Sequence, residues 1–427
     1  MRKLARQGIY WVGILIGSYL FLSGLQTAYA DQPEPPPSSL PPWISVFEGD
    51  LRLFDYQRLN DGNVDNPHAK SALAALAKLY VQSRSQYGFS FGLGLYAVSD
   101  FGLSPALPQR DTSIMGSSNS FATPGQAFLQ YQRFGVNIRA GNILLDNPWV
   151  NGSALIMPAS YQGIRLLATP LNNLTLEAAY WGRWRPRNSS DYTTTNLYDV
   201  QVPGAWDTGI HYNKSLSNGH LDLQYWYYGF TSIAGMSYTQ GLYRIDTRSG
   251  WNPYVGAQYA HETDQGSSIL GPVEARVYGA LLGVQKGEGS YSIAYNKIPE
   301  RSGAFQNGNI VSPYTGPYNN TPLYTASMLH GLIDQSTTGS AWKVAAAYWL
   351  GVDRAWRLKG SYAYYRQDQF LHPGQTGNPR ELNADATYFI RTGPLRGLSI
   401  RDRFGVFSYP GAPKAFFDNR IQIQYAF

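Results

Sequence analysis

The sequence contains no cysteine among its 427 residues. This absence excludes a disulfide framework and any metal site built on cysteine ligands. Charged residues are also sparse, at 15% of the chain, and the formal net charge is +6. Because no run of basic residues could follow a phosphate backbone, we expect no nucleic-acid partner. The six histidines show no close pairing, so we expect neither a metal nor a cofactor.

Long apolar runs are missing outside the first 30 residues. A helix that crosses a bilayer needs about 20 consecutive apolar residues, and no later segment approaches that length. Residues 9–25 are apolar, follow three basic residues and lead to an Ala-Tyr-Ala sequence, which is typical of a secretory signal peptide. We therefore predict that residues 1–30 are a cleaved signal peptide. Residues 31–46 hold six prolines, so we expect an extended periplasmic lead-in without helix or ladder.

Aromatic residues, in contrast, are abundant, with 33 Tyr, 18 Phe and 11 Trp. The last nine residues read NRIQIQYAF, and residues 420–425 among them alternate strictly between polar and apolar side chains. Such a strand has one face for lipid and one for water, and aromatic residues suit the two interfaces of a membrane. The same alternation recurs in residues 88–99, 174–184, 342–350, 358–364 and 382–391.

These patterns predict an all-β fold, a transmembrane antiparallel β-barrel formed by residues 47–427. Segments of this kind number about 18, and an even number is normal for a bacterial outer-membrane barrel. The count leaves residues 323–330 as either a strand or a loop. A barrel of this size has an open interior, so it conducts solutes or is plugged. We expect the segment 145–162, which mixes turn formers with apolar anchors, to fold inward as a constriction loop.

Three stretches of the sequence resemble the OprD-type outer-membrane porin family. They are residues 140–165 (AGNILLDNPWVNGSALIMPASYQGIR), residues 393–403 (GPLRGLSIRDR) and residues 418–425 (DNRIQIQY). The resemblance implies an 18-stranded, substrate-selective channel in the bacterial outer membrane, as a loose trimer or a monomer. It also implies a ladder of arginines on one inner wall that faces an acidic or hydroxyl-lined patch.

Cations in mid-strand are expected to point inward, because an arginine on the lipid face costs ~2–4 kcal/mol at the midplane. The resemblance assigns the ladder first to Arg401 and Arg403, then to Arg52, Arg139 and Arg391. Aligned guanidinium groups would offer weak, repeated sites for a carboxylate. Alternatively, these cations pair with Glu177, Asp385 or Asp402 and select nothing. The candidates on the pore-facing phase are Arg52, Arg139, Arg165, Arg183, Arg357, Lys359, Arg391, Arg401, Arg403 and Arg420.

Two residues of the expected constriction loop are further candidates. Asp146 is a possible counter-charge for an amine group, or else a local cap at the start of a turn. Tyr161 is either a hydroxyl at the eyelet or the aromatic residue that anchors the loop.

The sequence therefore predicts a non-enzymatic channel for passive diffusion of small solutes that carry a carboxylate, such as amino acids, organic acids and small peptides. Outer-membrane lipid and the solutes themselves are the expected partners. The alternative solute is an oligosaccharide, which could stack on pore-facing Trp181 and Trp349. A hydrolase or an adhesin is a weaker alternative. Ser90 does fit a G-x-S-x-G pattern, but it lies within an alternating strand rather than at a strand-to-helix turn.

Overall fold

The computed structural model describes residues 41–427, except 61–68, 153–154, 316–320, 330–332 and 334–336. The predicted signal peptide (1–30) and most of the predicted lead-in (31–46) therefore lie outside the described residues. Among the described residues, no helix is long and apolar enough to cross a membrane.

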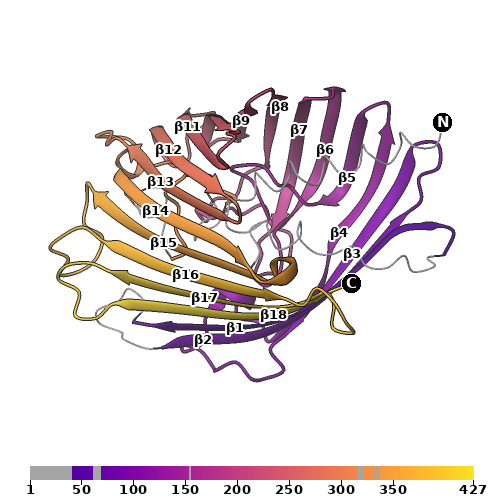
Figure 1. Ribbon diagram of the computed structural model, residues 1–427, viewed down its shortest axis with the longest axis horizontal. Coiled ribbons are helices and arrows are strands. Elements are labelled where there is room, and N and C mark those ends of the chain that lie inside the picture. The colour runs from indigo at the N-terminus through magenta and orange to yellow at the C-terminus, as the bar shows by residue number, and fades with distance from the viewer. Residues whose placement is uncertain (1–40, 61–68, 153–154, 316–320, 330–332, 334–336) are drawn as a thin grey trace.

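Eighteen antiparallel strands form one closed sheet, because each strand pairs with its sequence neighbours and β1 pairs with β18. Figure 1 shows the strands following one another around the barrel, from indigo β1 to yellow β18. The predicted fold class and strand number are confirmed. The strands are β1 (Ile44–Leu59), β2 (Lys70–Ser83), β3 (Phe89–Ser99), β4 (Ser120–Arg133), β5 (Val136–Ile143), β6 (Ser160–Leu171), β7 (Leu174–Arg185), β8 (Ala205–Leu216), β9 (Gly219–Phe230), β10 (Ala234–Ile245), β11 (Trp251–Asp264), β12 (Glu274–Lys286), β13 (Gly289–Ile298), β14 (Gly339–Leu350), β15 (Trp356–Gln367), β16 (Arg380–Phe389), β17 (Leu398–Ser408) and β18 (Phe416–Ala426).

The helical elements of the described part of the chain are short. They are the α-helix α3 (Thr112–Met115) and the 3-10 helices η1 (Phe305–Gly308) and η3 (Val352–Arg354).

The barrel wall begins three residues earlier than predicted. Ile44 already pairs with Ser83 of β2, so residues 44–46 belong to β1 and not to the lead-in. The last proline of the lead-in is Pro42. Beyond it every backbone N–H can donate to a ladder, which is why the strand starts at once.

Alternation of side chains explains how the wall separates lipid from lumen. On β3, Phe89, Phe91 and Leu93 are exposed on the outer face, whereas Ser90 and Tyr96 are buried inside. Exposed apolar rows of this kind recur on the strands around the barrel. An outer surface of this composition suits the hydrocarbon region of a bilayer.

The two rims of the barrel differ in their connections. The start of β1 and the end of β18 lie side by side at one rim, where the connections include two-residue turns such as 134–135 and 217–218. Long connections, such as 100–119 and 299–338, lie at the other rim. In barrels of bacterial outer membranes, short turns are periplasmic and long loops extracellular. We name the two rims accordingly.

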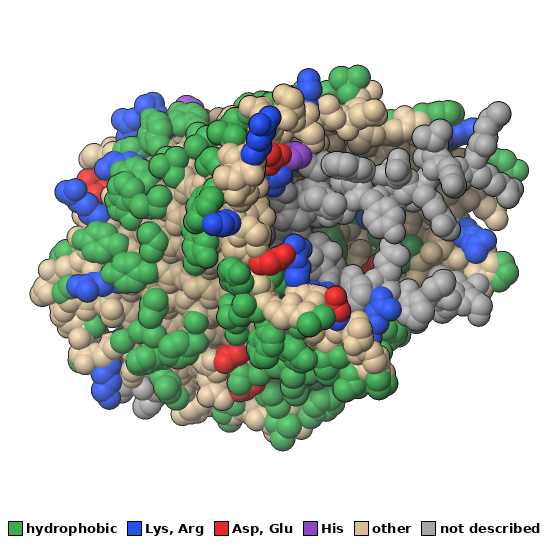
Figure 2. All heavy atoms as spheres, in the orientation of Figure 1, with side chains coloured by type: hydrophobic (Ala, Val, Ile, Leu, Met, Phe, Trp, Pro, Cys, Tyr) green, Lys and Arg blue, Asp and Glu red, His purple; other side chains and the backbone are tan. Residues whose placement is uncertain are grey.

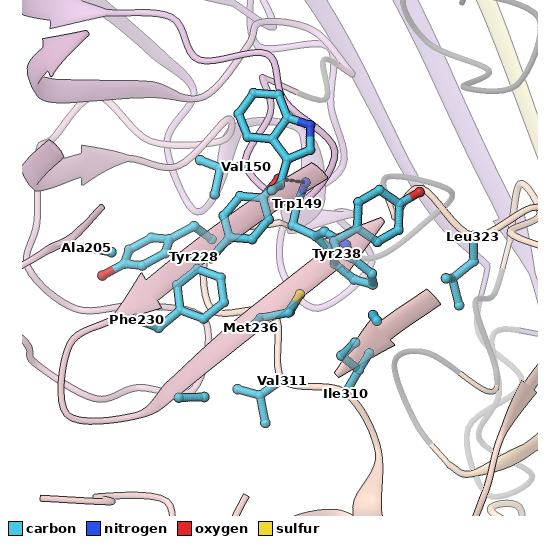
Figure 3. Close-up of a cluster of buried hydrophobic side chains, with 14 of the residues drawn as sticks. Trp149, Val150, Ala205, Tyr228, Phe230, Met236, Tyr238, Ile310, Val311 and Leu323 are labelled. Atoms are coloured by element: carbon cyan, nitrogen blue, oxygen red, sulfur yellow. Dashed lines mark hydrogen bonds between the residues drawn. The ribbon is translucent and has the colours of Figure 1, made fainter. Parts of the chain in front are cut away.

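The connection between β5 and β6 enters the lumen, and we call its described residues (144–152 and 155–159) the first inner loop. Its Trp149 is fully buried against Tyr228 and Tyr238 of β9 and β10, as Figure 3 shows. Its Ile156 packs in a second cluster with Phe54 on β1. The loop therefore lies along the inner wall from β9–β10 to β1–β2. It is shorter than the predicted segment 145–162, because β6 already begins at Ser160.

The connection between β13 and β14 also folds into the lumen, and we call its described residues (299–315, 321–329, 333 and 337–338) the second inner loop. The N–H of Val311 donates to Glu262 Oε2 of β11 at 2.7 Å, and the N–H of Leu329 donates to Glu381 Oε1 of β16 at 2.7 Å. Residues 323–329 contain no strand and lie inside the barrel. The segment 323–330 is therefore a loop as far as it is described.

Candidate functional site on the inner wall

Five cations of β15, β17 and β18 face the lumen on one side of the barrel. In the antiparallel register Arg420 lies opposite Arg403, and Arg403 lies opposite Asp385 of β16. Asp385 in turn lies opposite Lys359. Because residues in register share one face of a sheet, these side chains form a row across four strands. We call the five cations the basic wall; they are Arg357, Lys359, Arg401, Arg403 and Arg420.

Carboxylates neutralise this wall only in part. Arg401 forms a two-point ion pair with Asp385, with 2.9 Å between Nε and Oδ1. Arg420 pairs with Asp418, with 2.6 Å from Nε to Oδ1. Arg403 is only 4% exposed, yet its Nε has no hydrogen-bond partner among the described residues. The wall therefore contains a buried guanidinium N–H for which the described residues supply no acceptor.

Carboxylates gather on the opposite side of the lumen. Glu177 of β7 and Asp207 of β8 are buried and face inward, and these strands lie across the closed sheet from β16–β17. Asn147 of the first inner loop donates to Asp207 Oδ2 at 2.9 Å. Arg165 of β6 binds both oxygens of Glu177, at 2.8 Å each. We call Asp146, Glu177 and Asp207 the acidic side.

Asp146 is the member of the acidic side with the most accessible side chain. It lies in the first inner loop, bridged through the backbone to Asn151. Enclosure within the barrel raises the pKa of Asp146 to about 6, while Arg165 acts to lower this pKa and Glu177 to raise it further. Asp146 therefore changes its charge close to neutral pH.

The family of the chain follows from a comparison with protein-family models. A model described as "outer membrane porin, OprD family" matches residues 92–427, which is most of the chain. This chain belongs to the OprD family of outer membrane porins. It is a protein of the bacterial outer membrane, and its family and fold are those of substrate-specific channels. The resemblance seen in the sequence is thereby confirmed.

Solved structures of similar fold agree with this assignment. The crystal structure of Pseudomonas aeruginosa OccK9 (OpdG) is 17% identical, with 89% of this chain and 97% of that chain covered and a TM-score of 0.76. Pseudomonas aeruginosa OpdK with vanillate is 14% identical, with coverage of 90% and 99% and a TM-score of 0.71. Acinetobacter baumannii OccAB3 is 18% identical, with coverage of 89% and 98% and a TM-score of 0.70. At these identities the likeness concerns the fold. No curated protein sequence matches the chain significantly.

In this porin, Arg52 of β1 faces inward and holds the first inner loop. Its Nη1 donates to the carbonyls of Leu155 and Ile156, at 3.1 and 3.0 Å, and its Nη2 lies 3.0 Å from Asp50 Oδ2. The same charge that was predicted to line the pore therefore anchors a loop. Arg58, six residues further along the same inward phase, was not among the predicted residues and pairs with Asp418 at 3.3 Å.

Arg139 of β5 lies beside Arg165 in register and faces inward with it. Its Nε donates to Gln130 Oε1 at 2.7 Å, and its guanidinium carbon lies 4.7 Å from the centre of the Phe128 ring. These contacts fix Arg139 against the wall. Because Gln130 is neutral, this hydrogen bond does not neutralise the positive charge of Arg139.

Arg183 lies on the outer face, contrary to the prediction. The register between β6 and β7 shifts at Gly182, so that Arg183 pairs with Gln162 and is exposed on the outside. The bulge adds one residue and so turns Arg183 to the outer face. The buried inward cation is instead Arg185, which donates to the carbonyl of Pro158 at 2.7 Å. The glycine in mid-strand was the available signal for this bulge.

Arg391 lies beyond the end of β16, in the periplasmic turn 390–397, and not in the wall of the lumen. Its guanidinium carbon stands 4.5 Å from the centre of the Phe389 ring, and its Nη2 reaches the carbonyl of Arg354 at 3.5 Å. Arg357, by contrast, is buried at the periplasmic end of β15, 5.5 Å from the Trp349 ring centre. The basic wall therefore ends at Arg357 on this side.

Tyr161 is the first inward side chain of the β6 wall and is fully buried. Its hydroxyl donates to the carbonyl of Asn151 at 3.3 Å and faces that of Tyr314 at 3.5 Å. Its ring packs edge-on against Trp181 at 5.5 Å. Tyr161 therefore joins the two inner loops to the wall and offers no accessible hydroxyl to a solute.

The second inner loop reaches the basic wall itself. The carbonyl of Met328 accepts a hydrogen bond from Arg420 Nη2 at 3.5 Å, and the carbonyl of Ala326 accepts one from Lys343 at 2.6 Å. Glu262 and Glu381, which hold this loop, lie far away from it in the chain, so no local pattern in the sequence indicates its path. Among the described residues no group of three or more histidine, aspartate or glutamate residues could hold a metal ion.

Proposed function

We propose that the porin passes small solutes that carry a carboxylate, such as amino acids, organic acids and small peptides, along the basic wall. The observation that carries the proposal is the row of Arg420, Arg403 and Lys359 across neighbouring strands, with Arg403 lacking a partner for its Nε. Guanidinium groups bind carboxylates through paired hydrogen bonds. Repeated, moderately strong sites allow a solute to enter and to leave again.

The basic wall and the acidic side lie on opposite sides of the lumen. This arrangement favours solutes that carry two groups of opposite charge. A solute with both an ammonium and a carboxylate group would turn its carboxylate toward Arg403 and its ammonium toward Glu177 and Asp146. Asp146 is the accessible carboxylate of that side and is negative above its pKa of about 6. The neighbouring structure of OpdK was solved with vanillate, which carries a carboxylate.

Removal of charge from the basic wall tests the proposal. We expect the double variant Arg401→Gln with Arg403→Gln to take up an anionic organic acid about tenfold more slowly in a liposome assay, which corresponds to ~1.4 kcal/mol. Uptake of a neutral sugar of equal size should stay unchanged. The matched control is Arg183→Gln, which removes an arginine from the outer face and should leave both rates alone. An equal loss for anionic and neutral solutes would reject the proposal.

The oligosaccharide alternative has no comparable support. Trp181, one of the two tryptophans expected to stack on sugar rings, is fully buried between Tyr161 and Tyr314. Trp349 packs beside Arg357 and Phe389. Neither ring forms part of an open stacking platform, so we do not propose a sugar as the solute.

A further inference from the structure

Outward-facing cations gather at the extracellular rim over β12–β16. Lys297 of β13 lies in register with Ser340, and Ser340 lies in register with Arg366 of β15. Arg380, the first residue of β16, lies opposite Tyr364. Tyr278, which lies opposite Lys297, is exposed on the outer face, and so is Tyr364. All three cations therefore belong to the outer phase of their strands. We call Lys297, Arg366 and Arg380 the outer patch.

The outer patch is not neutralised by nearby acids. None of its three cations forms an ion pair with a described residue within the salt-bridge distance of 4.0 Å. Arg276 and Arg301 lie at the same rim and share Glu274, at 3.7 and 3.6 Å. Glu300 and Asp368 also lie at this rim. In Figure 2, basic side chains stand at the left edge, beyond a broad field of hydrophobic side chains.

An aromatic girdle fixes the level of the patch in the membrane. The rings of Tyr295 and Trp342 lie 4.5 Å apart on the outer face, and those of Tyr259 and Tyr278 lie 5.4 Å apart. Trp342 is two residues further into the barrel than Ser340, and so lies on the membrane side of the row that holds Lys297. Aromatic girdles mark the boundary between hydrocarbon and headgroups. The outer patch therefore stands at headgroup level.

We propose that the outer patch binds the phosphate groups of an anionic glycolipid in the outer leaflet of the membrane. Lys297 and Arg366 are two strands apart, roughly 10 Å, and Arg380 is on the next strand, so the cations can engage neighbouring phosphates of one headgroup. Arginine binds phosphate through two parallel hydrogen bonds, and lysine acts as a point charge. The acyl chains of the same lipid would lie against the girdle and the apolar face below it.

A comparison with Arg183 on β7 indicates on which side of the barrel the lipid binds. Arg183 also faces outward at the extracellular rim, but its neighbours in register and phase are Gln162 and Asn142, which are neutral. A single cation gives one weak, salt-screened contact, whereas three adjacent cations act together. The lipid should therefore be retained on the β12–β16 side.

Lipid titration of the purified full-length mature porin in neutral detergent tests the proposal. The probes are a bis-phosphorylated glucosamine-disaccharide lipid, the same lipid after removal of its phosphates, and inorganic phosphate. We expect the triple variant Lys297→Gln, Arg366→Gln, Arg380→Gln to bind the phosphorylated lipid at least fivefold more weakly than the parent porin, as measured by native mass spectrometry. Arg183→Gln is the matched control and should bind like the parent.

Three outcomes would overturn the proposal. The first is unchanged lipid binding by the triple variant. The second is equal binding of the phosphorylated and dephosphorylated lipids by the parent porin, a comparison that needs no variant. The third is displacement of the lipid by an equimolar amount of inorganic phosphate, which would mean that the patch takes a free anion. Support would be a preference for the phosphorylated lipid that falls with added salt and with loss of the patch.

Discussion

Arginines on the β6–β7 side of the lumen are satisfied by local acceptors, whereas the basic wall on β15–β18 keeps a guanidinium edge without one. Arg165 binds both oxygens of Glu177 at 2.8 Å. Arg185 donates to the carbonyls of Pro158 and Ser189, at 2.7 and 3.0 Å. Arg403, in contrast, has no partner for its Nε among the described residues.

The difference shows that inward phase alone does not define the role of an arginine. Where loop carbonyls surround the guanidinium group, as at Arg185, the side chain holds the inner loops in place. Arg403 lies between Arg420 and Asp385 in register, Asp385 is already paired with Arg401, and the Nε of Arg403 keeps no acceptor among the described residues. The surroundings of each arginine, and not its position on the strand, therefore separate the arginines that hold loops from those that we propose to bind a solute.

Replacing Arg185 and Arg403, one at a time, by the same residue tests this comparison. We expect this test to give the largest effect, on the free energy of unfolding. We expect Arg185→Met to lower the free energy of unfolding by about 3 kcal/mol, because several buried acceptors lose their donor. Arg403→Met should change it by less than about 1 kcal/mol, because a poorly satisfied charge is replaced by an apolar side chain. Denaturant unfolding of the folded barrel in lipid vesicles measures both. Equal costs at the two positions would contradict the distinction.

Release of the second inner loop would sharpen the comparison by uncovering the basic wall. In Glu381→Leu the N–H of Leu329 loses its acceptor, and we expect the loop that covers Arg420 to detach. Single-channel conductance in a planar bilayer should then rise about twofold, with a larger share carried by anions. Glu381→Gln keeps an acceptor oxygen in place and is the matched control. A conductance that rises equally in both variants would point to the charge of Glu381 and not to the loop.

The pH dependence of ion selectivity tests whether the charge of Asp146 on the acidic side acts on passing ions. We expect this effect to be the smallest of the three. Because the pKa of Asp146 is raised to about 6, the side chain is mostly neutral at pH 5 and mostly negative at pH 7. Preference for anions over cations should therefore fall as the pH rises, by less than about twofold for one accessible charge. Reversal potentials in a salt gradient measure this preference. Asp146→Asn should flatten the profile between pH 5 and pH 7, and an unaltered profile would exclude Asp146 as its source.

Much of the wall was predictable because the two-residue period of a strand is local information. The outward and inward faces of β3 and β15 follow directly from the alternation of their side chains. The inward phase of Arg401 and Arg403 follows in the same way. The phase of Arg183 could not be assigned correctly, since the bulge at Gly182 depends on how β7 pairs with β6.

The interior of the barrel was predictable only in part. The first inner loop carries a local pattern of turn formers and apolar anchors, and it does fold inward. The second inner loop is held by Glu262 and Glu381, which are about 50 residues away along the chain on either side. Contacts over such separations leave no periodic signal in the sequence. The trimer implied by the family resemblance stays a prediction.

The seam between β1 and β18 has a consequence for biogenesis. It joins Asp50 to Ala426, so the first strand meets the last only after the intervening polypeptide has been delivered. Before that moment both edge strands present unpaired backbone groups, which hydrocarbon cannot satisfy. Contacts between such distant parts of a chain also form slowly. The backbone groups of the two free edges are therefore satisfied only in the step in which β1 and β18 meet and the cylinder closes.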